Sequence, residues 1–527
     1  MAGLVCGVDV GTGSARAGIF DRHGVLLGRS ERPIALYREQ GDRGEHAADE
    51  IWVAVSAAIR GALAASGATP ADVAGLSFDA TCSLVVRGSG GAPLALTEGP
   101  PPRDTIAWFD HRAIAEAEEF TATVHPVLDH LGGAMSPEMQ LPKLMWLKRR
   151  RPDLWRRAVF LFDLADFLTW KATGSLARSQ CTLVAKWTYL AHAGGWQRDL
   201  LARIGLDDLL QRGALPEGAV PAGTDLGPLT PSAASDLGLT TRCRVGAGLV
   251  DAFAGALGML GPLGHRPGVA WPPEDSLALI GGTSSCLMSL SREPRRMPGG
   301  WGPYFGAVLP GTWMTEAGQT ATGALLDHLL RWHAAGGEPE AALHGRVAAR
   351  IAALRAEEGP DLAPRLHVLP DFLGNRAPLA DPHAQGVISG LTLDVSFDSL
   401  CRLYFRSCVA IALGVRQILE TLAGSANGPP SLHMTGGHTR NPLLMELYAD
   451  ATGCSLVEPV VDDAVLRGTA MAAAAAAGLH PDLLSAARAM GAATRLRRPD
   501  PAARPRLDRD YAVFLEMQRQ RRRLAEL

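Results

Sequence analysis

The feature that most constrains the fold is a pattern that occurs twice: an apolar strand, a turn of small and hydroxyl residues, and another apolar strand. In the first copy the predicted strands, 5–10 and 15–20, are joined by Gly11-Thr12-Gly13-Ser14. In the second copy the strands, 277–280 and 286–290, are joined by residues 281–285. Glycine-rich turns can aim several backbone N–H groups at one anion, because no Cβ blocks the approach. The two copies predict two loops that face one ligand.

Strand and helix patterns alternate after the first copy. We expect a third strand at 25–27, an amphipathic helix over about 49–65 and a strand at 73–79. Near the C-terminus, Asn441 suits an N-cap, Pro442 the first helical position and Gly453 the residue after the helix. Further helices are predicted at about 464–477 and 508–527, and the Arg519 to Arg523 cluster of the latter is expected on a solvated face. This alternation predicts an α/β fold.

Length and composition indicate two domains. A chain of 527 residues with 47% hydrophobic residues is too long for one ordinary core and can bury two. A glycine- and proline-rich break near 261–275 marks the expected boundary.

The formal net charge of −3, without long blocks of one sign, gives no reason to expect a nucleic-acid or anionic-membrane partner. The eight cysteines lack a C-x-x-C pair, no signal-peptide pattern opens the chain, and no window is apolar enough for a membrane span. We therefore expect a cytoplasmic protein with a small, neutral or weakly charged substrate.

Asp9 ends the first strand beside the glycine-rich turn. A carboxylate there is costly without a partner, and a magnesium ion is the natural one, although an aspartate can also cap its own turn. Neither turn is a Walker A loop, since Gly-Lys-Ser/Thr does not occur, and Arg16 stands where the dinucleotide fingerprint needs its third glycine. A nucleotide must be held in another way.

Four ordered motifs resemble those of the FGGY carbohydrate kinases, which belong to the actin-like ATPase superfamily. Residues 9–16 resemble their first phosphate motif, 281–285 the second and 436–441 the adenosine motif. Residues 246–255 resemble the segment that bears the catalytic aspartate, here Asp251. The resemblance covers roughly 3 to 485. Read alone, Asp251 could also be a helix N-cap.

The resemblance implies two ribonuclease-H-like domains, at 1–262 and 275–485, around an interdomain active-site cleft, followed by a helical tail at 486–527. It implies ATP as co-substrate, Asp251 as general base, and Mg²⁺ near Asp9 and Asp251. The nucleotide contacts that it implies are Gly11, Thr12, Gly13, Ser14, Arg16, Gly282, Thr283, Ser284, Gly318, Thr322, Gly436, Gly437 and Asn441. His438 stands where many relatives carry a small residue.

Sugar recognition is expected mainly from the first half. The turn at 78–83 and the W-x-D-x-R signature at 108–112 occupy the family's sugar-contacting positions, with Arg112 expected as the ion-pair partner of Asp110. The implied substrate contacts are Asp79, Thr81, Cys82, Trp108, Asp110, Lys186 and Asp251. Lys186 can equally be a surface lysine, and a structural role is expected for Lys143.

The runs at 79–83, 370–378 and 434–442 are most similar to the ribulokinase-type branch, particularly its D-ribulokinase group. The implied reaction is phosphorylation of D-ribulose to D-ribulose 5-phosphate. A ribitol or L-ribulose kinase remains an alternative, because a few hydroxyl contacts separate these substrates. A non-catalytic, nucleotide-dependent sugar sensor is the alternative from another class. A homodimer is compatible with the sequence.

Overall fold

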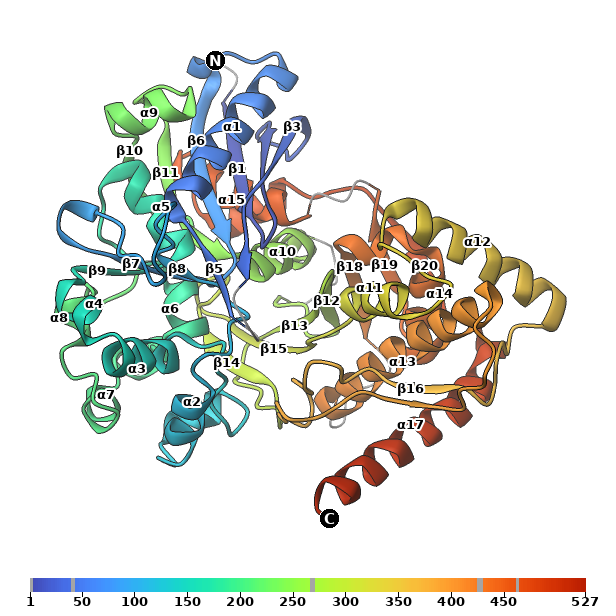
Figure 1. Cartoon of the computed structure of the whole chain (residues 1–527). Helices are drawn as coiled ribbons and strands as arrows, with labels where there is room; N and C mark the ends of the chain where they lie inside the picture. The colour runs from blue at the N-terminus through green and yellow to red at the C-terminus, as the bar shows by residue number, and fades with distance from the viewer. Residues whose placement is uncertain (1–2, 39–42, 266–270, 424–429, 461–463) are drawn as a thin grey trace.

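The structure is a computed structural model that describes residues 3–38, 43–265, 271–423, 430–460 and 464–527. Figure 1 shows two sheet-containing halves side by side, the N-terminal half in blue to green and the C-terminal half largely in yellow to red. The expected α/β class is confirmed. The expected boundary at 261–275 falls partly on 266–270, outside the described residues.

The N-terminal half is built on a six-stranded sheet in the order β10-β11-β6-β1-β2-β3. β1 pairs antiparallel with β2 and parallel with β6, which in turn pairs parallel with β11. The strands are β1 Leu4–Val10, β2 Ser14–Phe20, β3 Leu26–Pro33, β6 Val73–Ala80, β10 Asp225–Pro228 and β11 Arg244–Val250. A second sheet contains β4 Tyr37–Arg38, β5 Gly44–His46, β7 Leu84–Arg87, β8 Thr105–Ile106 and β9 Phe160–Asp163.

The helices before the break surround these sheets (Figure 1). They are α1 Ala48–Ser66, α2 Ile114–Thr121, α3 Gln140–Arg150, α4 Pro152–Arg157, α5 Leu164–Thr173, α6 Gln180–Lys186, α7 Arg198–Arg203, α8 Leu209–Arg212, α9 Pro231–Leu237 and α10 Asp251–Leu260. Helices α1, α5 and α9 share one buried apolar cluster with alternate residues of β1, including Val8 and Val10. Because side chains alternate along a strand, Asp9 points to the opposite face.

The C-terminal half repeats the arrangement in a seven-stranded sheet, β14-β15-β13-β12-β18-β19-β20. As in the first half, an antiparallel hairpin is extended by two parallel strands. The strands are β12 Ser276–Gly281, β13 Ser285–Ser291, β14 Trp301–Phe305, β15 Trp313–Gln319, β18 Ser431–Thr435, β19 Leu456–Pro459 and β20 Thr494–Arg497, with a separate ribbon of β16 His367–Leu369 and β17 Val387–Ser389. The helices are α11 Gly323–Trp332, α12 Ala341–Glu358, α13 Phe397–Ala423, α14 Pro442–Thr452, α15 Ala464–Ala476, α16 Leu483–Ala489 and α17 Arg504–Ala525.

Helix α15 lies against the N-terminal sheet, although it comes late in the sequence (Figure 1). A Cβ added at Gly7 would lie 2.3 Å from the carbonyl oxygen of Leu466, and one at Gly75 2.4 Å from that of Ala473. Glycines on adjacent strands therefore let the backbone of this alanine-rich helix approach the sheet. The predicted helices are confirmed, including the Asn441 cap, whose side chain accepts from the N–H of Leu444 at 3.2 Å.

The expectation that the whole Arg519 to Arg523 cluster is solvated is wrong at one position. Arg521 is buried and forms an ion pair with Asp371, while Arg519 on the same helix is largely exposed. Among the helices in the described part of the chain, none combines the length and the apolar character that a bilayer crossing requires.

Candidate active site

A cavity of about 280 Å³ lies between the two halves. It is reached by the carboxyl ends of β1, β6 and β11 from one sheet and of β12 and β18 from the other. Carboxyl ends of parallel strands meet at one edge of a sheet, so motifs far apart in the sequence gather there. The lining residues are Asp9, Gly11, Thr12, Arg16, Thr81, Cys82, Trp108, Glu138, Lys186, Val250, Asp251, Ala252, Ile280, Gly281, Gly282, Thr283, Ser284, Cys286, Glu316, Arg376, Gly436, Gly437 and Val465.

The first phosphate loop is a tight hairpin turn in which the N–H of Gly11 donates to the carbonyl oxygen of Ser14 at 3.0 Å. Asp9 and Arg16 are opposite each other in the strand register, and their side chains form an ion pair at 3.1 Å. Asp9 Oδ1 is buried without a hydrogen-bond partner. The hairpin thus presents Thr12, a cation and a carboxylate to the cavity, whereas Gly13 and Ser14 are absent from the lining.

Asp9 and Asp79 are neighbours on parallel strands β1 and β6. Burial raises the pKa of Asp9, against the opposing effect of Arg16. Burial, and then the Asp9 carboxylate, raise the pKa of Asp79 well above its ordinary range. Asp79 is fully buried, accepts a short hydrogen bond from Thr469 of α15 and does not line the cavity. Asp79 is therefore the more easily protonated of the two carboxyls, while Asp9 is paired with Arg16.

Asp251 is the first residue of α10, directly after β11, and lines the cavity. Its Oδ1 accepts a hydrogen bond from the N–H of Ala252 at 2.7 Å. Burial, and then the charge of Asp9, raise the pKa of Asp251 to about 6. A carboxylate with a pKa just below neutrality is ionised at pH 7 yet basic enough to take a proton, as a general base requires.

Four of the residues predicted to contact the sugar line the cavity, and we call them the sugar wall. Thr81, Cys82, Trp108 and Lys186 line the cavity. Lys186 is buried, and its ammonium lies 4.0 Å from the ring centre of Trp301. Burial would lower the pKa of Lys186, but nearby anionic and ionisable groups, Cys82 and Glu316 among them, raise it overall. The surface-lysine alternative is therefore wrong, and a buried cation faces the cavity.

Asp110 lies behind this wall. Its Oδ1 accepts from the N–H of Arg112, and its Oδ2 from the N–H of Gly44 at 2.8 Å and from Arg112 Nη2 at 2.7 Å. Asp110 is fully buried and does not line the cavity, so the structure brings it close to the site without exposing it there. The expected ion pair with Arg112 is confirmed. Lys143 donates to the carbonyl oxygens of Ala107 and Trp108, the structural role expected for it.

Three charged residues of the cavity were not predicted as site residues. Glu138 and Glu316 are buried, and Arg376 forms an ion pair with Glu316. Burial would raise the pKa of Glu138, but His111, Arg376 and Lys186 together lower it to about 2. Glu138 Oε2 has no hydrogen-bond partner. Glu316 lies within an apolar strand, the same signal that singled out Asp9, whereas Glu138 gives no comparable signal.

The second phosphate loop is joined to the adenosine motif by His438. His438 Nε2 lies 2.9 Å from the carbonyl oxygen of Gly282, and Nδ1 lies 3.0 Å from the hydroxyl of Tyr448. Burial lowers the pKa of His438 to about 4, so the ring is neutral. A carbonyl oxygen only accepts, which places the ring proton on Nε2 and makes Nδ1 the acceptor. Gly281 leaves room for this ring, because a Cβ there would lie 2.2 Å from Nδ1.

Other predicted nucleotide contacts lie behind the loops. Thr322 Oγ1 donates to the carbonyl oxygen of Gly282 at 3.2 Å and accepts from Ser285 Oγ at 3.0 Å. Gly318 pairs with β13 and Asn441 caps α14, and none of these three predicted contacts lines the cavity. In this structure they support the loops instead.

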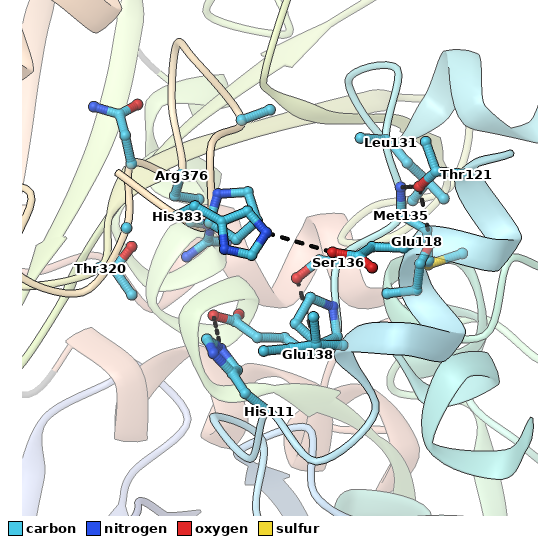
Figure 2. A pocket seen from close by; sticks show the side chains of 18 of the residues that line it. His111, Glu118, Thr121, Leu131, Met135, Ser136, Glu138, Thr320, Arg376 and His383 are labelled. Atoms are coloured by element: carbon cyan, nitrogen blue, oxygen red, sulfur yellow. Dashed lines mark hydrogen bonds and ion pairs between the residues drawn. The ribbon is translucent and has the colours of Figure 1, made fainter. Parts of the chain in front are cut away.

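A second cavity, of about 350 Å³, adjoins the first and shares Glu138 and Arg376 with it. Figure 2 shows Arg376 and His383 on one side of this cavity and Glu118 and Glu138 on the other. His383 Nε2 lies 3.4 Å from Glu118 Oε1, a contact between the two halves. The space between the halves thus continues beyond Glu138.

Comparison with known proteins gives two family-model matches. Residues 4–258 match the N-terminal domain of the FGGY family of carbohydrate kinases, and residues 277–477 match its C-terminal domain. The chain is 41% identical to the FGGY carbohydrate kinase domain-containing protein of Danio rerio, covering 97% of this chain and 96% of the relative. It is 36% identical to a D-ribulokinase of Saccharomyces cerevisiae, covering 89% and 71%. A xylulose kinase structure from Rhodospirillum rubrum superposes with a TM-score of 0.77 at 23% identity, covering 99% of this chain and 100% of the other.

Proposed function

The chain belongs to the FGGY family of carbohydrate kinases, and we propose that it transfers the γ-phosphoryl group of ATP to the terminal hydroxyl of D-ribulose. The observation that carries the proposal is Asp251, a half-buried carboxylate with a raised pKa facing a cavity that both phosphate loops also line. The choice of sugar is supported by the 36% identity to a D-ribulokinase. The chain therefore has the expected actin-like ATPase fold, which is the fold of the FGGY family.

In the proposed reaction Asp251 takes the proton of the sugar's terminal hydroxyl as its oxygen attacks the γ-phosphorus. The new bond joins sugar oxygen to phosphorus, the bond from that phosphorus to the β-phosphate oxygen breaks, and ADP leaves. The loop residues that line the cavity, Thr12, Thr283 and Ser284 among them, would bind the phosphates, and Arg16 would offset their negative charge. The proton returns from Asp251 to solvent after the product leaves.

A magnesium ion fits the residues present. Asp9 and Asp251 both line the cavity, and the charge of Asp9 raises the pKa of Asp251, so a cation near both carboxylates would be stabilised. Magnesium is commonly held by one or two carboxylates and by substrate phosphates. Asp9 and Asp251 would hold it. When bound, Mg²⁺ neutralises the phosphate oxygens and orients them for transfer.

The sugar would lie against Thr81, Cys82 and Trp108, with charged partners at Lys186, Glu138 and Glu316. A buried ammonium donates to a carbonyl or hydroxyl oxygen, and the two carboxylates accept from hydroxyls. The unpartnered Oε2 of Glu138 supports this assignment, because buried polar atoms otherwise find partners. Asp79 and Asp110 would act through the wall residues in front of them.

We further propose that residues 1–262 form the sugar-binding domain that bears the base and 275–485 the nucleotide-binding domain. The expected purely helical tail at 486–527 is corrected by the structure, because strand β20 of this segment joins the second sheet before helix α17. A cytoplasmic location, small-molecule partners only and a homodimer belong to the same proposal.

The test is ADP release with D-ribulose, L-ribulose, ribitol, D-xylulose and glycerol at equal concentrations, with and without Mg²⁺. We expect the highest kcat/KM with D-ribulose and no turnover without Mg²⁺. A preference for ribitol or L-ribulose would replace the proposed substrate. Sugar binding without transfer by the unmodified enzyme would favour the sensor and overturn the kinase proposal.

A further inference from the structure

The long loop at 370–386 joins β16 to β17 and contributes Arg376 to the active-site cavity. Both ends of this loop contact one side chain, Arg521 of α17. Arg521 forms an ion pair with Asp371 and donates to the carbonyl oxygen of Gln385 at 3.3 Å. Arg521 is buried, whereas residues 522–527 that follow it are all exposed. The last buried residue of the chain is therefore the one that closes the base of the loop.

Asp371 connects Arg521 to the middle of the loop. Its Oδ1 accepts from the side-chain amide of Asn375 at 2.9 Å. The side-chain oxygen of Asn375 accepts from the N–H of Leu379 at 3.1 Å, and its backbone exchanges two hydrogen bonds with Asp381, at 2.8 and 2.9 Å. The backbone is thus fixed around Asn375, immediately before Arg376.

Arg376 extends this series of contacts into the active-site cavity. Its guanidinium is 3.8 Å from the ring centre of Trp301, forms an ion pair with Glu316 and lies 3.5 Å from Cys286 Sγ. Glu316 is buried and lines the cavity. A short chain of polar contacts therefore runs from the C-terminal helix to a carboxylate of the proposed sugar site.

We propose that Arg521 is a positioning residue for sugar binding, which acts through Asp371 and Asn375 to place Arg376 and, through it, Glu316. The proposal rests on the proposed function, in which Glu316 is a hydroxyl acceptor. Helix α17 is a stable base for this role, because Asp510 forms an ion pair with Arg406 of α13 on its buried face. Loss of the Arg521 charge leaves Asp371 buried without its cation, which favours rearrangement of the loop.

The experiment compares R521Q with R519Q, a matched control two residues away whose side chain is 68% exposed. We expect R521Q to raise the KM for D-ribulose about tenfold while the KM for ATP changes by less than about twofold, and R519Q to change neither. R521K should recover part of the loss, because a lysine keeps the charge but cannot contact both ends of the loop equally. A chain ending at Gln520 should match R521Q, and one ending at Arg521 should match the unmodified enzyme.

Amide hydrogen exchange gives a readout that does not depend on activity. The chain of contacts from Arg521 to Arg376 predicts that the backbone amides of 370–386 exchange faster in R521Q. The amides of 504–518 in α17 should exchange at an unchanged rate. Faster exchange along all of α17, or equal increases in both KM values, would indicate a merely structural role and overturn the proposal, as would an unchanged KM for D-ribulose. If the unmodified enzyme phosphorylates no sugar, the proposed function fails, whereas the exchange result still decides whether Arg521 holds the loop.

Discussion

Trp108 Nε1 donates a hydrogen bond to the hydroxyl of Thr12 at 2.9 Å. Trp108 belongs to the predicted sugar wall and Thr12 to the first phosphate loop, and both line the cavity. Lys143 holds the same segment from behind through the carbonyl oxygens of Ala107 and Trp108. The hydrogen bond between Trp108 and Thr12 therefore couples the sugar wall to the first phosphate loop.

This contact predicts that W108F affects both substrates. The ring is largely conserved, but the donor to Thr12 is lost, so the phosphate loop loses a support. We expect kcat/KM to fall about tenfold for D-ribulose and for ATP alike, measured by steady-state kinetics. The control is W332F, since Trp332 is 54% exposed. A W108F effect confined to the sugar would show that the wall and the loop act independently.

The raised pKa of Asp251 predicts the pH dependence of the reaction. Only the ionised carboxylate accepts a proton, so activity should fall about tenfold per unit as pH decreases through the pKa of Asp251, which is about 6 without a cation and which bound Mg²⁺ would lower. D251N should lower kcat by about 10²- to 10⁴-fold and abolish this limb of the profile, while sugar binding by calorimetry persists. D207N, at a side chain 74% exposed, is the control. An unchanged acid limb in D251N would assign the base elsewhere.

The position of Glu138 predicts that the effect of its substitution on KM depends on the length of the substrate. E138Q removes the charge that the unpartnered Oε2 would offer to a hydroxyl remote from the transferred one. We expect the KM for D-ribulose to rise about tenfold, but that for glycerol, which is too short to reach as far, to stay within about twofold. The matched control is E118Q, because Glu118 lines only the adjoining cavity and its side chain is 63% exposed. Equal effects on long and short substrates would contradict the contact.

The contacts of His438 predict that Tyr448 affects nucleotide binding without touching the nucleotide. Y448F removes the hydroxyl next to His438 Nδ1 and leaves a buried acceptor unsatisfied, at a cost of about 1–3 kcal/mol in the free energy of unfolding. Because His438 also holds Gly282, the KM for ATP should rise while that for the sugar stays unchanged. Y37F, which removes a hydroxyl bonded to Glu50, is the control in urea unfolding and in kinetics. A loss of stability without a change in the KM for ATP would limit His438 to a structural role.

Much of the fold followed from local sequence. The hairpins at 4–20 and 276–291, the helix capped by Asn441 and the small-residue helix α15 lie where periodicity and capping residues predicted them. Short-range patterns suffice for such elements, because their hydrogen bonds and caps form between residues close in the chain. The position of Asp9 at the end of a strand belongs to this predictable part.

The polar lining of the cavity was predicted less completely. Glu138, Glu316 and Arg376 come from three separate segments, and no single segment carries a pattern that relates them. Conversely, Asp110 and Thr322 were expected as ligand contacts, but their polar atoms bond to neighbouring protein groups. Motif membership places a residue near a site, whereas exposure to the ligand depends on what packs in front of it.

The sequence by itself determined two strand-turn-strand units, the order of the motifs and the family. Only the tertiary structure decided the surroundings of the carboxylates. Asp79 bonds to Thr469, 390 residues away in the chain, while Asp9, its neighbour in the sheet, pairs with Arg16. Burial and charge are properties of surroundings assembled from distant segments, so the pKa values of Asp9, Asp79 and Asp251 depend on the tertiary structure.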